Sequence, residues 1–352
     1  MARNVYRLLV LGSACFLLFL VFPYLRYYGD YIRQTNPFSD QRYIEQGFTP
    51  TKSELSCLHG TQPPDNATLV DSEPISDPIP NIVHFIFGLK KPPRRPQRGA
   101  LVSLDPDHLY IHYTYLASPP SADPNASPLS NTWIARLALH PAVHLIHHRP
   151  HNPSSTHHAH LSDTLRLSLL LSHGGIYLDI DAFALRPLPP LLNPPAPHDV
   201  VLGHEGGNRW GLCNAVIAAR PNATFIRRWL DSYSNIEFAH EKWNFHSVLL
   251  PKEMADQHPG EVCALPPDAF FWPTWTWRHV EWMHEPLGRG EARFWEREID
   301  RNGGGITSGQ MVYHAWKQMA WERYLKELTP RTVREKVTRF NFLVRRFVED
   351  DL

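Results

Sequence analysis

The chain has 352 residues, 43% hydrophobic and 20% charged, which is enough for one large core or two smaller ones. Its 35 basic and 35 acidic residues give a formal net charge of zero, so no global charge recruits it to nucleic acid or to an acidic membrane surface. The 33 prolines gather in connections between apolar segments, and this indicates stiff linkers rather than disorder.

The N-terminus carries an uncharged apolar run over residues 8–25, preceded by Arg3 and Arg7. Its length suits a helix that crosses a hydrocarbon core of about 30 Å. We therefore expect a short cytoplasmic tail (1–7), a transmembrane signal anchor (8–25) and a lumenal stem (26–78). A cleaved signal peptide and a buried helix are the alternatives, but bulky residues follow the run where a cleavage site would need small ones.

Three N-glycosylation sequons agree with a lumenal body. They begin at Asn66, Asn125 and Asn222. Of the four cysteines, Cys15 lies in the apolar run, so the others permit at most one internal disulfide. The sequence leaves open which pair forms among Cys57, Cys213 and Cys263.

The folded domain is expected over 79–352, where predicted strands and helices alternate. The β-branched and aromatic run 79–89 opens it as a buried strand. Further strands are expected at 109–116, 142–148, 176–180, 199–203 and 213–219. Helices are expected at 131–140, 157–172 and 223–233, and two more, broken near Pro330, in the tail 319–348. This alternation predicts an α/β fold, a sheet with helices on both faces.

Two carboxylates, Asp179 and Asp181, interrupt the end of the strand predicted at 176–180. Because side chains alternate along a strand, both should project to one side while Ile180 projects to the other. Paired carboxylates repel unless a cation lies between them, and Mg²⁺ or Mn²⁺ is the natural occupant, which in turn attracts phosphates. A lone D-x-D is nevertheless a weak signal, since most instances are ordinary surface or turn carboxylates.

The preceding helix strengthens the signal. Asp163 and Arg166 lie at i and i+3 and share one helix face, either as a structural ion pair or as contacts to a nucleotide sugar. Gly174 and Gly175 then end the helix and would let the following strand approach its neighbours closely.

The stretch 162–188, SDTLRLSLLLSHGGIYLDIDAFALRPL, resembles the signature of the DXD-containing glycosyltransferases of family 32, which include fungal Golgi mannosyltransferases and the vertebrate lactosylceramide galactosyltransferase. The family pattern is an Asp-x-x-Arg helix followed by Gly-Gly-x-Tyr-x-Asp-x-Asp. The chain meets it at Asp163, Arg166, Gly174, Gly175, Tyr177, Asp179 and Asp181. The run 79–89 and the segment YHAWKQMAW (313–321) are also similar to family segments, so the resemblance spans 79–321.

The resemblance implies a GT-A fold, a Rossmann-like mixed sheet flanked by helices, and C-terminal helices beyond it. It also implies transfer of a hexose from a nucleotide-sugar donor to a glycan or glycolipid, with retention of anomeric configuration. GDP-mannose is the expected donor and a UDP-sugar the alternative. A bound Mn²⁺ or Mg²⁺ would stabilise the charge that develops on the departing diphosphate.

The same resemblance assigns roles to individual residues. Asp179 and Asp181 would be the catalytic pair that holds the metal, with His314 as a further candidate ligand. The donor would be bound by four residues of the pattern and its closing segment. These are Asp163, Arg166, Tyr177 and Lys317. Asn214, at the start of a predicted strand, is a further donor-contact candidate, although a strand-end hydrogen-bonding role is equally open.

Three other stretches suggest chemistry more weakly. The histidines of 144–160 show no defined zinc pattern and favour a solvated loop. The aromatic run 270–282 suits either the core or an acceptor pocket, and the basic run 90–98 favours a solvated loop.

The sequence therefore predicts a type II membrane glycosyltransferase of the secretory pathway, placed in the Golgi. A haloacid-dehalogenase-type phosphatase also uses D-x-D after an apolar strand, but its motif wants Thr or Val where Phe183 stands. A non-catalytic lumenal glycan-binding protein on a transferase fold is the remaining alternative.

Overall fold

The computed structural model describes residues 44–45, 47–59, 78–87, 99–113, 128–130, 132–148, 158–188, 192, 198–234 and 244–348, with parts of 7–25. Its strands are β1 (Ile82–Phe87), β2 (His108–Tyr113), β3 (Val143–His147), β4 (Gly175–Leu178), β5 (Ala182–Ala184), β6 (Val200–Glu205), β7 (Gly211–Ala219), β8 (Val262–Leu265) and β9 (Val312–His314).

The described helices of the sheet-containing part are α2 (Lys52–His59), α3 (Gly99–Leu104), α4 (Thr132–Leu137), α5 (His158–His173), α7 (Thr224–Ser232), α8 (Leu250–Gln257) and α9 (Pro267–Phe270). Those that follow are α10 (Trp277–His284), α11 (Arg289–Arg301), α12 (Lys317–Ala320), α13 (Pro330–Glu335) and α14 (Arg339–Val344). Short helical turns are η1 (Pro128–Ser130), η3 (Phe245–Leu249), η4 (Trp321–Leu325) and η5 (Arg345–Phe347).

The main sheet has seven strands in the order β3-β2-β1-β4-β7-β6-β8. β1, β2, β3 and β4 are parallel, β7 runs antiparallel to both of its neighbours, and β8 is parallel to β6. The carboxyl ends of β1, β4 and β6 therefore meet the beginning of β7 at one edge. A second sheet of two antiparallel strands, β5 and β9, lies beyond that edge.

Alternation along the strands divides the core between two faces. On one face, Leu167 and Leu170 of α5 pack with Phe225 and Trp229 of α7 and with Ile217 of β7. On the other face, the core is formed with residues of α3, α4 and α9. The predicted α/β sheet with helices on both faces is thus confirmed.

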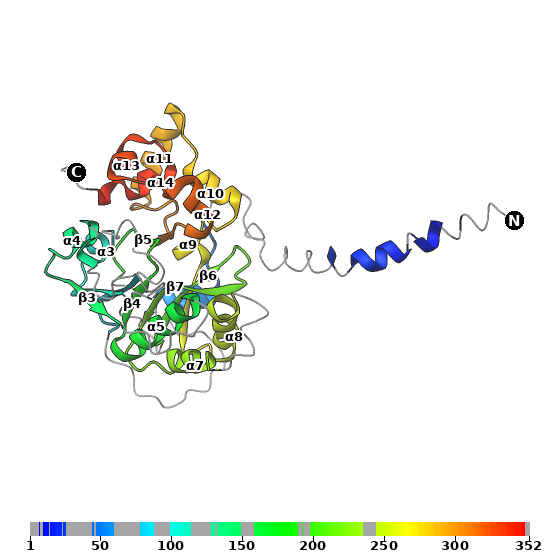
Figure 1. Ribbon diagram of the computed structural model, residues 1–352, viewed down its shortest axis with the longest axis horizontal. Helices are drawn as coiled ribbons and strands as arrows, with labels where there is room; N and C mark the ends of the chain where they lie inside the picture. Colours follow the sequence, from blue (N-terminus) through cyan, green and yellow to red (C-terminus); the bar gives the residue numbers. More distant parts are fainter. Residues whose placement is uncertain are drawn as a thin grey trace, which may run out of the picture.

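A third cluster holds the C-terminal helices together around β5 and β9. Phe340 and Leu343 of α14 pack with Trp295 of α11 and with Tyr313 of β9. Figure 1 shows these helices as a separate group at one end of the sheet, opposite α5, α7 and α8. The tail forms more, shorter elements than the two helices that we expected. Pro330 begins α13, and Thr338 caps α14 by accepting the Asn341 N–H at 3.0 Å, so a second break falls between these helices.

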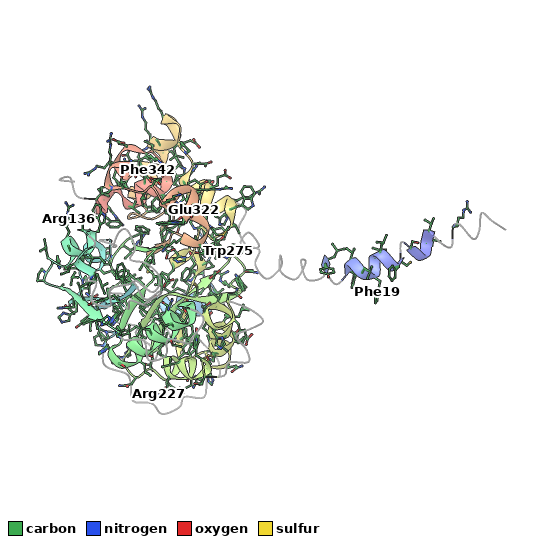
Figure 2. All side chains as sticks on the ribbon, viewed as in Figure 1. Phe19, Arg136, Arg227, Trp275, Glu322 and Phe342 are labelled. Atoms are coloured by element: carbon green, nitrogen blue, oxygen red, sulfur yellow. A yellow bond between two sulfur atoms is a disulfide. The ribbon has the colours of Figure 1, made fainter. Side chains whose placement is uncertain are left out.

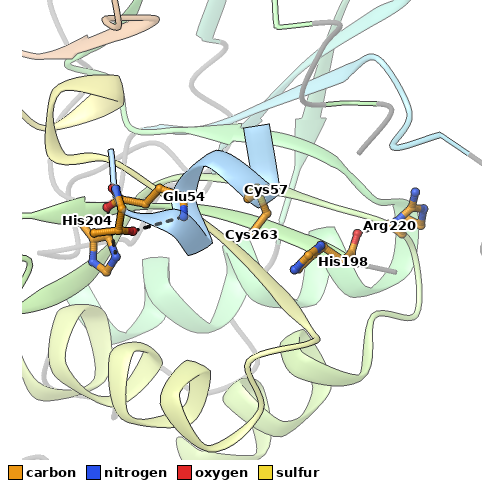
Figure 3. Close-up of a disulfide and its surroundings, with 7 residues drawn as sticks. Glu54, Cys57, His198, His204, Arg220 and Cys263 are labelled. Carbon is orange, nitrogen blue, oxygen red and sulfur yellow. Dashed lines mark hydrogen bonds and ion pairs between the residues drawn. A yellow bond between two sulfur atoms is a disulfide. The ribbon is translucent and has the colours of Figure 1, made fainter. Parts of the chain in front are cut away.

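Part of the expected stem is folded onto the sheet domain. α2 is joined to β8 by a disulfide between Cys57 and Cys263, whose Cα atoms are 5.4 Å apart, as Figure 3 shows. In the same helix, the buried Glu54 carboxylate lies 2.6 Å from Nε of Arg209, which follows β6. Of the pairings that the sequence left open, the structure forms this one, and Cys213 stays a buried free thiol.

The expected anchor lies at 8–25, where the structure describes most but not all residues. None of the helices in the described parts of the chain has the length and apolar character needed to cross a bilayer. Membrane anchoring therefore remains an expectation from the sequence.

Candidate active site

The turn between α5 and β4 contains two glycines that let the strand before the D-x-D segment approach its neighbour closely. Gly174 has φ 64° and Gly175 has φ 101°, conformations that side-chain-bearing residues rarely adopt. A Cβ on Gly175 would collide with the carbonyl oxygen of Ile82 in β1. The glycine pair thus allows β4 to lie directly against β1 at the start of their pairing.

Asp179 and Asp181 lie in a turn rather than in the strand that we expected over 176–180. β4 ends at Leu178, the Asp179 N–H donates to the Ala215 carbonyl at 2.8 Å, and the Ala182 N–H donates back to the Asp179 carbonyl at 2.9 Å. The chain turns here into β5, which pairs with β9. The two carboxylates converge because of this turn, so the expected strand alternation was the wrong reason for their proximity.

The turn brings both carboxylates to His314 of β9. One ligand atom from each of Asp179, Asp181 and His314 lies within 4.8 Å of the other two. Asp179 and Asp181 keep 28% and 14% of their side chains exposed, so the cluster is open on one side. Two carboxylates and an imidazole fit a divalent cation such as Mn²⁺ or Mg²⁺, and these three residues could hold it.

The surroundings shift the pKa values of the two carboxylates in opposite directions. Burial by itself would raise the pKa of Asp181, but the positive charge available on His314 and the backbone N–H of Lys317, at 2.7 Å, lower it to about 2. Burial raises the pKa of Asp179, and the charge of Asp181 adds to this effect against the attraction of Arg166. Burial would lower the pKa of His314, but Asp181 beside it raises the pKa above its usual value. Asp181 is therefore the better charged ligand.

A buried network joins α5 to this turn through Arg166. Its Nη1 lies 3.1 Å from Oδ1 of Asp179 and donates to the Asn214 carbonyl at 2.8 Å, while its Nη2 lies 3.1 Å from Oδ1 of Asp163. Asn214 donates to the same oxygen of Asp163 at 2.8 Å, and Tyr177 donates its hydroxyl to Asp179 at 2.6 Å. The guanidinium also lies over the Tyr177 ring, 4.5 Å from its centroid.

This network answers part of what the sequence left open. Asp163 and Arg166 do form an ion pair, but one that also engages β7 and the D-x-D turn. Asn214 joins it because β7 is antiparallel and so begins at the edge where β4 ends. Burial would lower the pKa of Arg166, but Asp179 and the other acidic groups around it raise it, so the guanidinium stays charged.

Lys317 contacts the site through its backbone. Its backbone N–H binds Asp181, whereas its ammonium lies 5.4 Å from the centroid of the Trp321 ring. The amide is presented to the carboxylate by Trp316, which adopts φ 49° and donates its indole N–H to the Pro273 carbonyl at 2.8 Å.

Sequence reasoning assigned no role to Glu205, considered Cys213 only as a possible disulfide partner, and treated Trp275 only as part of an aromatic run. Glu205 ends β6 at the same edge of the sheet, is 5% exposed, and accepts the Trp275 indole N–H at 3.0 Å. An acidic residue at the end of an apolar strand was the available signal, as it was for Asp179.

The structure thus brings a carboxylate pair, an imidazole and a buried arginine together at one edge of a mixed α/β sheet, a set of groups that could hold a divalent cation and a phosphorylated ligand. Residues 129–201 match the family described as the glycosyltransferase sugar-binding region containing DXD motif. Glucan organizing enzyme 1 of Cryptococcus neoformans var. grubii serotype A is 34% identical over 290 residues, which cover 77% of this chain and 71% of that protein.

The chain therefore belongs to the DXD-containing glycosyltransferases of the family 32 type, and it is a transferase. Among solved structures, the PaToxG glycosyltransferase is similar over 76% of this chain and 87% of its own, with 17% identity and a TM-score of 0.38. The glycosyltransferase GlyE of Streptococcus pneumoniae is similar over 78% of this chain and 61% of its own, with 13% identity and a TM-score of 0.42.

Proposed function

We propose that this transferase has a GT-A fold and uses Mn²⁺ or Mg²⁺ to move a hexose from a nucleotide-sugar donor to a glycan or glycolipid. The observation that carries the proposal is the convergence of Asp179, Asp181 and His314 within 4.8 Å at the open edge of the sheet. A bound divalent cation would there supply the positive charge that stabilises the departing diphosphate.

The residues around the cluster would bind and orient the donor. Arg166 fixes Asp179 by direct contact and keeps α5 against the turn. By the family resemblance, Asp163 and Asn214 would contact hydroxyl groups of the sugar or ribose, and Tyr177 would pack near the nucleotide. The Lys317 amide holds Asp181 in the orientation that a metal ligand needs.

In the proposed reaction, the oxygen of an acceptor hydroxyl forms a bond to the anomeric carbon of the donor sugar. The bond from that carbon to the diphosphate oxygen breaks, its electron pair leaves with the nucleoside diphosphate, and the hydroxyl proton passes to the leaving group. The family resemblance supports attack from the face that the leaving group vacates, which retains the anomeric configuration. We assign no carboxylate as a covalent nucleophile.

GDP-mannose is the proposed donor, with a UDP-sugar as the alternative. The name of the Cryptococcus relative supports the inclusion of glucan oligosaccharides among the acceptors to be tested. We further propose that the protein is a type II membrane protein of the Golgi with a lumenal catalytic domain. The apolar run at 8–25, the sequons and the disulfide between Cys57 and Cys263 support that placement, since disulfides persist in oxidising compartments.

A nucleotide-release assay tests the proposal. The purified full-length chain is incubated with GDP-mannose, UDP-glucose, UDP-galactose or UDP-N-acetylglucosamine, with Mn²⁺, with Mg²⁺ or with EDTA. We expect release of GDP or UDP from one donor, which EDTA abolishes and Mn²⁺ restores. Equal release in EDTA and in Mn²⁺ would contradict the metal-dependent mechanism.

A further inference from the structure

Glu205 is a buried carboxylate whose hydrogen-bond donors are neutral side chains. Its Oε1 accepts the indole N–H of Trp275 at 3.0 Å, and the Cys213 thiol donates a second hydrogen bond. No described Lys or Arg forms an ion pair with it, and burial raises its pKa above the usual value. His314 is a positive group that favours the ionised form of Glu205, but burial of a carboxylate still costs stability, and such groups are found disproportionately where a ligand uses them.

Glu205 borders the candidate metal cluster without belonging to it. It interacts electrostatically with His314, and burial together with the charges of Glu205 and Asp179 raises the pKa of the Cys213 thiol. The set of ligand atoms within 4.8 Å of one another nevertheless contains only Asp179, Asp181 and His314 among the described residues. Glu205 therefore lies beside the place where the donor would be held, on the β6 side of β7.

Trp275 lies near the candidate metal cluster because the segment that contains it is hydrogen-bonded to Trp316. Trp316 donates to the carbonyl of Pro273, two residues before Trp275, and the Trp316 ring lies edge-on to His314 with 4.2 Å between centroids. Trp275 is only partly buried against the core. Figure 2 shows it between the C-terminal helices and the sheet.

We propose that Trp275 and Glu205 form the acceptor subsite and bind a saccharide, an inference that rests on the proposed function. The half-buried indole offers a flat apolar surface for one face of a sugar ring, as aromatic side chains do in small-molecule sites. A carboxylate has about four lone-pair positions, so Glu205 can accept a saccharide hydroxyl besides its two present donors. The Trp275 indole N–H fixes the carboxylate for that contact.

The test measures acceptor and nucleotide affinity separately in the full-length chain. Trp275→Ala removes the ring, Trp275→Phe keeps a ring but removes the N–H donor, and Glu205→Gln keeps the shape but removes the charge. The acceptor probes are laminaribiose, maltose and methyl α-D-mannopyranoside. Sugar transfer to each probe gives its KM, and calorimetry gives its Kd. Trp277→Ala is the matched control, because Trp277 lies in the same segment but is 60% exposed and stacks with Arg278.

We expect Trp275→Ala and Glu205→Gln to raise the acceptor KM about tenfold, and Trp275→Phe to raise it less, while Trp277→Ala leaves it unchanged. The Kd of GDP or UDP in the presence of Mn²⁺ should stay within about twofold of the parent, which also reports correct folding. An unchanged acceptor KM, or a parallel loss of nucleotide affinity, would overturn the acceptor assignment. A parent protein that binds neither nucleotide with Mn²⁺ would instead overturn the proposed function.

Discussion

Nη1 of Arg166 lies 3.1 Å from Oδ1 of Asp179, so a buried ion pair connects helix α5 directly to the D-x-D turn. Because the same guanidinium also contacts Asp163 and Asn214, one side chain sets the relative positions of α5, β4 and β7 at the site. The planar fork of arginine suits this arrangement, since it presents several donors in fixed directions.

Replacement of Arg166 by lysine should therefore be severe although the charge is kept. The donors of an ammonium all lie on one atom, so lysine cannot span the separate positions from which Nη1 and Nη2 of Arg166 reach Asp179 and Asp163. We expect transfer to fall about a hundredfold and the free energy of unfolding to fall by about 3 kcal/mol. Urea unfolding and nucleotide release measure the two effects. Arg228→Lys is the control, because Arg228 forms its ion pair with Glu261 at the surface and should change stability by less than about 1 kcal/mol.

Asp181→Asn should remove metal-dependent transfer while the protein stays folded. The amide oxygen can still accept the Lys317 backbone N–H, but it lacks the charge that binds a cation, so we expect at least about a hundredfold loss of transfer and weaker Mn²⁺ binding. Titration of Mn²⁺ by electron paramagnetic resonance checks the binding. The exposed Asp231 of α7 provides the control Asp231→Asn, and parental activity in Asp181→Asn would refute the metal role.

The disulfide that joins α2 to β8 should stabilise the domain. It connects residues separated by 206 positions in the sequence, and its loss should lower the free energy of unfolding by about 2–5 kcal/mol. We expect dithiothreitol to lower the urea midpoint of the parent protein but not that of a Cys57→Ala, Cys263→Ala double variant. An equal response of the two proteins would argue against this pairing.

Gly175 should be intolerant of any side chain. With φ 101° and the Ile82 carbonyl in the way, Gly175→Ala should cost about 2 kcal/mol or more and displace β4 from β1. Gly290→Ala in helix α11 is the matched control, because open space surrounds Gly290 and alanine favours helix by up to about 1 kcal/mol. Thermal unfolding of both variants provides the comparison.

A chain of buried histidines should make the stability of the fold depend on pH. His84 Nε2 lies 3.0 Å from the Gly174 carbonyl, which can only accept, so His84 accepts in turn from His112, and His112 from His148. Burial lowers the pKa of His84 to about 4 and that of His112 to about 2.

Because these folded-state pKa values lie below the unfolded value near 6.5, the unfolded chain binds more protons as the pH falls below about 6.5. Stability is therefore fully present above about pH 6.5 and should decrease by up to about 1.4 kcal/mol per histidine and pH unit below it, until each folded-state pKa is reached. Urea midpoints from pH 7.5 to 4.5 measure the slope. His112→Gln should flatten it, and an unchanged slope would contradict the assignment.

Local sequence patterns were sufficient for the α/β alternation and for the helix that became α5. The contiguous motif also singled out Asp163, Arg166, Asp179 and Asp181, which the structure brings to one place. The reason is that burial leaves a period along a strand or helix, and that the motif is contiguous. The tail was predicted less well, since its short helices are separated by caps such as Thr338 rather than by a clear change of period.

The sequence could not predict which distant segments of the chain come into contact. The approach of His314 to Asp181 depends on the pairing of β5 with β9. Asn214 meets Asp163 because β7 is antiparallel to β4. Glu205 and Trp275 meet although 70 positions separate them in the sequence. The sequence thus determined which chemical groups the protein has and which faces it buries. Only the tertiary structure decided which groups meet, because strand register and loop packing are fixed by the whole core rather than by neighbours in the chain.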